Sequence, residues 1–188
     1  VSVFREALDQ IEHAEETPGH PVYTFKKENR EVEKVIEEKI NPAISKYKTA
    51  QGEEVKKAIY EMLEGLNLLM DLDKHYSRKE NLVFPYLEKY GITGPPSVMW
   101  GIDDDIRDEL KMTIRNIKDL GEDEEQKDYI INEVELLIKM ITEMIYKEEN
   151  ILFPMCLDTL TEDEWGQIME QSSEIGYCLI EPEYQWKP

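Results

Sequence analysis

HYSRKENLVFP, residues 75–85, returns as MIYKEENILFP at residues 144–154. Both copies end in Phe-Pro, and each lies near the end of a long segment whose apolar residues recur with helical spacing. Because proline has no backbone N–H, Pro85 and Pro154 are expected to stop or kink their helices. A repeat of this kind predicts two helix pairs related by pseudo-twofold symmetry, with the two copies facing each other inside a bundle.

The remaining sequence supplies two further long helices and short flanking ones. Amphipathic stripes predict helices over about 21–47, 53–89, 97–120 and 124–156, the first of them kinked at Pro42. Residues 90–96, YGITGPP, predict the loop between the two helix pairs. Thr161 and Glu164 are spaced as a capping box, which predicts a last short helix ending near Gly176.

These segments predict an all-α fold, an antiparallel up-down-up-down four-helix bundle with short extra helices at its ends. No segment has the two-residue alternation of a strand. Residues 1–16 are expected to form an N-terminal helix, the end of a preceding segment, and residues 17–188 the bundle with its C-terminal helix. Since position 1 is valine, the chain is expected to be part of a longer protein.

The composition excludes some partners. The 188 residues carry a net charge of −20, which argues against binding nucleic acid or an anionic membrane through a basic surface. No apolar run is long enough to cross a bilayer. Cys156 and Cys178 give no disulfide framework, so the sequence predicts a reducing, cytoplasmic location.

Several acids fall on or beside the apolar stripes of their own helices when successive residues are placed about 100° apart. A group of buried carboxylates needs a compensating cation, either a metal ion or a buried lysine or arginine. Lys79 and Arg107 are close enough in sequence to act as counter-ions, so both alternatives stay open. The inward-facing residues are Glu80 with His75 beside it, Asp103, Glu148, Glu149 at a stripe edge, and Glu28 in the first helix.

The motifs GHPVYTFKKEN, HYSRKENLVFP, VMWGIDDDIR and EMIYKEENILFP resemble those of the hemerythrin-like HHE cation-binding domain. More narrowly, they are similar to a prokaryotic branch in which this domain often precedes a PAS sensor domain. The resemblance covers nearly the whole chain. It implies a four-helix bundle with a non-haem di-iron centre, and roles in binding oxygen or in sensing oxygen, iron or nitric oxide.

The resemblance also implies a ligand set. Carried over by position, with Glu28 in reserve, the metal ligands are His20, His75, Glu80, Asp103, Glu148 and Glu149. Taken alone, His20 is better interpreted as a helix cap than as a metal ligand, because it precedes Pro21 at the start of a helix. Lys79 and Met144 stand where the family pattern has an acid and a histidine. A set with two histidines and several carboxylates suits iron, and zinc or manganese as alternatives.

The sequence is consistent with three functions. The favoured one is a sensory or regulatory module with an iron centre, di-iron by resemblance, which binds a small diatomic molecule such as oxygen and acts on a C-terminal signalling domain. The second is a metal-free helical signalling or interaction module, with the Lys79 ammonium in the place of the cation. The third is a di-iron oxidase or peroxidase.

Overall fold

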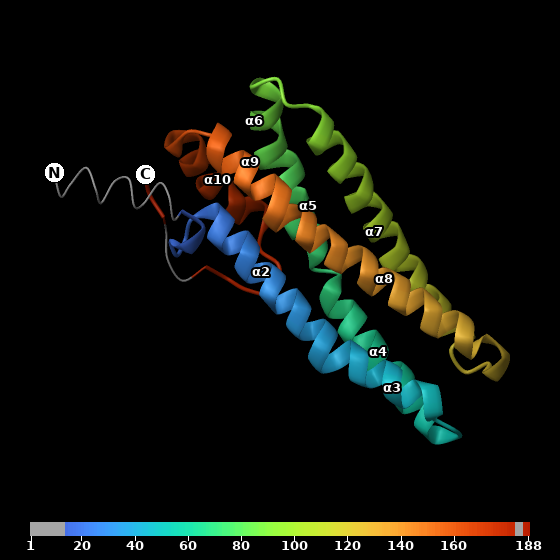
Figure 1. Cartoon of the computed structure of the whole chain (residues 1–188). Helices are drawn as coiled ribbons and strands as arrows, with labels where there is room; N and C mark the ends of the chain where they lie inside the picture. Colours follow the sequence, from blue (N-terminus) through green and yellow to red (C-terminus); the bar gives the residue numbers. More distant parts are fainter. Residues whose placement is uncertain (1–13, 183–185) are drawn as a thin grey trace.

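The computed structural model describes residues 14–182 and 186–188, and throughout this part of the chain the regular structure is helical. Four long helical rods form an antiparallel bundle (Figure 1), which confirms the predicted fold class. The expected N-terminal helix over 1–16 falls mainly outside the described residues; only the 3-10 turn η1 (Ala14–Glu16) is described. No helix of the described part is long and apolar enough to cross a membrane.

Each rod except the third is built from several consecutive helical segments. Short links at 50–52, 90–93 and 121–123 make successive rods antiparallel, and α7 packs against both α4 and α8. The rods are α2 (Pro21–Val35), η2 (Ile36–Ile40) and α3 (Asn41–Thr49); α4 (Glu53–Leu69), α5 (Leu72–Arg78), η3 (Lys79–Val83) and α6 (Phe84–Lys89); α7 (Gly94–Leu120); and η4 (Glu124–Gln126), α8 (Lys127–Lys147), η5 (Glu148–Leu152) and α9 (Phe153–Thr159).

The prolines at 42, 85 and 154 do not end their rods. Each follows a π-helical turn, η2, η3 or η5, that begins six residues before it. Proline lacks an N–H and its ring would clash with the carbonyl four residues back, and the wider turn accommodates both effects. The bonds that close the wider turns run from the N–H of Asn41 to Ile36, of Phe84 to Lys79, and of Phe153 to Glu148.

The helix predicted over 53–89 contains a break that the sequence pattern did not indicate. At Met70 and Asp71 the backbone forms a tight turn, with N–H groups bonded to carbonyls three residues earlier. The predicted capping box is present. Thr161 and Glu164 cap each other's backbone at the start of α10 (Glu162–Ile175), and α10 packs against α2 and α5 at one end of the bundle.

Candidate metal centre

The two sequence copies meet in the middle of the bundle through His75 and Glu148. His75 Nε2 lies 2.9 Å and 3.1 Å from the two carboxylate oxygens of Glu148, and Nδ1 lies 3.0 Å from Glu28 Oε1. Each ring nitrogen faces a carboxylate, so both must carry a hydrogen and the ring is an imidazolium. Burial alone would lower the pKa of His75, but Glu148 and Glu28 raise it to about 9.

Lys79 brings its ammonium to the same carboxylate. Its Nζ lies 2.6 Å from Glu148 Oε2, 3.2 Å from Asp103 Oδ1 and 3.6 Å from Met144 Sδ, and the side chain is 0% exposed. Burial opposes the charged lysine, but Asp103 and Glu148 outweigh it and raise the pKa of Lys79 above its ordinary value. Burial would raise the pKa of Glu148, yet His75 and Lys79 lower it to about 2.

Arg78 makes a second buried ion pair beside His75. Its Nη1 lies 2.7 Å from Glu28 Oε2, and its guanidinium stacks between the rings of Phe25 and Tyr177, at 4.5 Å and 4.6 Å. Burial would raise the pKa of Glu28, but Arg78 and His75 hold it below the usual range. Glu28, the reserve ligand of the sequence analysis, is therefore a central member of the buried network.

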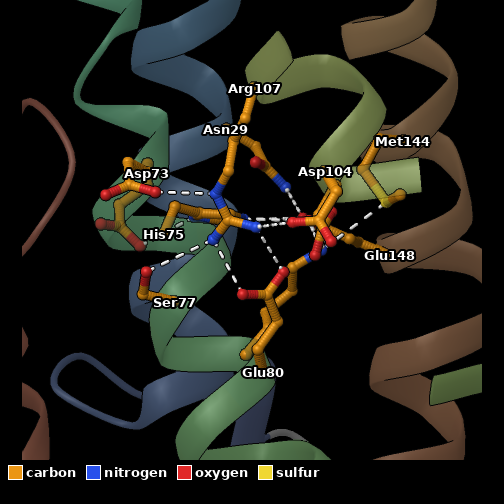
Figure 2. A network of polar contacts seen from close by, with 12 residues as sticks. Asn29, Asp73, His75, Ser77, Glu80, Asp104, Arg107, Met144 and Glu148 are labelled. Atoms are coloured by element: carbon orange, nitrogen blue, oxygen red, sulfur yellow. Dashed lines mark hydrogen bonds and ion pairs between the residues drawn. The ribbon is translucent and has the colours of Figure 1, made fainter. Parts of the chain in front are cut away.

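Glu80 is paired with an arginine, and it lies close enough to Asp103 to raise the pKa of that acid. Arg107 donates to both of its carboxylate oxygens at 2.8 Å, the bidentate geometry that favours strong recognition. The same guanidinium reaches Asp73 at 2.7 Å and Asp104 at 2.9 Å, as Figure 2 shows. Arg107 therefore neutralises Glu80, as the sequence had suggested for a counter-ion.

Glu149 lies at the edge of the network. It accepts hydrogen bonds from Asn29 at 3.1 Å and from Arg30 at 2.6 Å, and its side chain is 15% exposed. Asn29 also donates to Glu148 Oε1 at 2.9 Å. Of the two adjacent acids, the structure therefore places Glu148 in the interior and Glu149 at the rim.

The structure does not bring His20 into this group. His20 is the N-cap of α2, and its Nδ1 accepts the N–H of Val22 at 3.1 Å. The ring packs between Trp165 and Trp186, at 4.9 Å and 4.7 Å, and burial lowers its pKa to about 4. Along the helix His20 stands about 12 Å from Glu28, at the end of the bundle.

The fold and this set of polar residues define a class, the helical bundles that gather acids and a histidine between their helices. The sequence model of one such family, the hemerythrin HHE cation-binding domain, matches residues 20–156. The chain belongs to this family, since the match covers well over half of its length. A comparison with curated proteins found no significant match.

The residues present do not fit a metal ion in their observed arrangement. Within 14–182 and 186–188, no three side chains of His, Cys, Asp or Glu are grouped so that they could hold one. His75 has no free nitrogen lone pair, because both nitrogens donate to carboxylates. The oxygens of Glu148 are held by His75, Asn29 and Lys79.

The network also balances its own charge. Asp103 Oδ2 accepts no hydrogen bond among the described residues, and burial raises the pKa of Asp103 to about 7 against the opposing effect of Lys79. No further cation is required. The acids are Glu28, Glu80, Asp103 and Glu148; the basic groups are His75, Arg78, Lys79 and Arg107.

Arg78 and Asn29 were not among the residues predicted from the sequence. A signal for Arg78 exists, because it lies three residues after His75 and so shares its helix face. An arginine next to an inward-facing histidine could have been weighed with Lys79 as a counter-ion. Asn29 follows Glu28 directly and had no comparable signal, because consecutive helix positions point in different directions.

Proposed function

We propose that this hemerythrin-family domain is a sensory or regulatory module in which the buried charge network controls the C-terminal segment 176–179. Membership of a cation-binding family supports a role for the buried polar centre. The observation that carries the proposal is a direct link between that centre and the segment, made by the two oxygens of Glu28. A signalling partner would then bind the segment in one of its positions and not in the other.

Glu28 is the point of connection. Its Oε1 faces His75 at 3.0 Å, whereas its Oε2 accepts the backbone N–H of Cys178 as well as the guanidinium of Arg78. Arg78 also donates to the carbonyl of Gly176 at 3.4 Å. A change in the charge of His75 therefore acts on the carboxylate of Glu28, whose second oxygen accepts the N–H of Cys178 and holds the segment.

A second anchor lies one residue further. The N–H of Leu179 donates to Asp71 Oδ2 at 2.9 Å, at the break between α4 and α5. Leu179 has φ +62°, a left-handed conformation that is unfavourable for a branched side chain, so the fastened segment stores backbone strain. Release of the anchors would relieve that strain, which favours a segment with two states.

The second candidate function is the iron-dependent form of the same module. The family match favours it, because the family is named for cation binding. In that form an iron centre, di-iron by the resemblance, would sense oxygen, redox state or iron. It requires His75, Asp103 and Glu148 to release the partners that they have in this structure.

Glu148→Gln tests the link, because Glu148 makes no hydrogen bond to the described residues of the segment and is connected to it through His75 and Glu28. Removal of this anion should let burial return His75 to its neutral form, which weakens its bond to Glu28. We expect the amide of Cys178 to exchange at least about tenfold faster in hydrogen exchange, because its acceptor, Glu28, loosens, and the adjacent amide of Leu179 to lose protection with it. Amides of α7 provide the internal reference.

The matched control is Glu143→Gln, on the same rod but exposed. It removes one negative charge at a distance from the network and should leave the exchange of Cys178 unchanged. Equal protection of Cys178 and Leu179 in wild type and Glu148→Gln would show that the centre and the segment are not coupled.

A further inference from the structure

We infer that Lys79 is the resident cation of this centre, and that its ammonium excludes a metal ion from the bundle. The inference holds whether or not the module controls its C-terminal segment. It concerns what fills the centre of this member of a cation-binding family, and it assigns to Lys79 the charge that a bound ion would supply.

The position of Lys79 is the first argument. Lys79 opens the π turn η3, and its closest carboxylate, Glu148, opens the corresponding π turn η5 of the other sequence copy. The two π turns therefore place the Lys79 cation and the Glu148 anion next to each other between the rods. A fully buried lysine is rare, and it is tolerated only when it is paired.

The hydrogen bonding of the ammonium is the second argument. An ammonium has three hydrogens to donate. Three acceptors from three different elements surround Nζ: Glu148 of η5, Asp103 of α7 and Met144 of α8. The face of Tyr76, 4.8 Å away, provides further stabilisation for the cation. No donor of Lys79 is left without a partner.

A metal ion and the Lys79 ammonium would compete for the same carboxylate oxygens. A metal ion between Glu148 and Asp103 would have to stand where Nζ stands, 2.6 Å and 3.2 Å from their oxygens. Two positive charges at this point would repel strongly in a buried site. Displacement of the lysine into solvent is also disfavoured, because the side chain is 0% exposed.

Removal of Lys79 should therefore create a cation site. Lys79→Ala keeps Cβ and deletes a fragment with the structure of propylammonium, and it leaves Glu148 and Asp103 facing a cavity without a lysine. Propylammonium, Mn²⁺ and Zn²⁺ are suitable probes, the first for the shape and charge of the missing group and the ions for carboxylate coordination. A ligand that binds only the folded form raises the midpoint of thermal unfolding.

The experiment compares wild type, Lys79→Ala and Lys79→Met. Metal content is measured after purification without chelator, and thermal unfolding is followed with each probe at millimolar concentration. For wild type we expect less than about 0.1 ion per chain and no specific midpoint shift. Lys79→Ala should be stabilised by propylammonium or a divalent ion, with an affinity at least about tenfold above that of wild type, because its cavity carries unbalanced negative charge.

Lys79→Met is the matched control, because methionine removes the charge but fills most of the volume. It should gain no binding of either kind. Stoichiometric metal in wild type would overturn the inference, and so would a folded Lys79→Ala that binds none of the probes. If Lys79→Ala does not fold even with the probes present, the metal content of wild type decides alone.

Discussion

Glu148→Ala is expected to lower the free energy of unfolding by about 3–5 kcal/mol, because it leaves two buried cations without their common anion. Glu148 lies within 2.9 Å of His75 Nε2 and 2.6 Å of Lys79 Nζ, and both cationic side chains are 0% exposed. Asn29 loses an acceptor at the same time. Deletion of the anion costs more than the net value of the pairs, since the remaining charges stay desolvated.

Urea unfolding followed by circular dichroism measures this loss. The control is Glu143→Ala on the same rod, where the carboxylate is 56% exposed and lies 4.0 Å from Lys139. An exposed pair of this kind contributes little, so a change of about 0.5 kcal/mol or less is expected for the control. A loss below about 1 kcal/mol for Glu148→Ala would contradict the description of a buried, mutually dependent network.

Stability is expected to fall as the pH rises from about 6 to 9. The pKa of His75 is raised from its ordinary 6.5 to about 9 in the folded state, with Glu148 and Glu28 overcoming the effect of burial. A raised histidine pKa stabilises the fold fully below 6.5, and the contribution is lost as the pH rises through 9. The free energy of stabilisation lost over this pH range is about 3 kcal/mol, an upper limit because His75 is coupled to its neighbours.

Asp103 acts in the same direction at lower pH. Burial raises its pKa to about 7 from 3.8, although Lys79 opposes this, so the folded state holds the proton longer and loses stability as the pH approaches 7. Glu148 determines the pH at which stability is lost in acid. Its pKa of about 2 means that its contribution is complete above 4.5 and lost as the pH falls through 2.

Unfolding free energies measured between pH 5 and 9 test this profile. His75→Gln should flatten the decrease between pH 6.5 and 9, because glutamine does not titrate. Surface carboxylates and lysines are present equally in both proteins and cancel in the comparison. Equal stability of wild type at pH 6 and pH 9, or a rise over this interval, would contradict a charged His75.

Periodicity and the internal repeat predicted the bundle and the meeting of the two copies, because both depend on which face of each helix is apolar. The same reasoning placed Asp103 and Glu148 inside. It did not predict the π turns, since the projection assumes 3.6 residues per turn, and one added residue rotates the rest of the helix by about 100°. The projection nevertheless placed Glu149 at the edge of its apolar stripe, and Glu149 lies at the rim of the network, beside Arg30.

The ligand assignment depended on the resemblance and on position, and neither shows which partner a side chain has. His20 matches the expected motif but lies at a helix end between two tryptophans. Acids on an apolar stripe indicate that a cation is near, and this holds equally for a metal ion and for lysine. Only the three-dimensional contacts of Lys79 distinguish the two in this chain.

The most direct test is the side-chain ammonium of Lys79 itself, observed by ¹H–¹⁵N correlation spectroscopy near pH 6. Exposed lysines exchange their ammonium hydrogens with water rapidly, whereas a buried and fully bonded ammonium is protected. A buried Lys79 cation should give a protected lysine ammonium resonance that Lys79→Met abolishes and that added Fe²⁺ or Zn²⁺ leaves unchanged. Absence of this resonance, or its loss when metal is added, would contradict the claim that Lys79 is the cation of the centre.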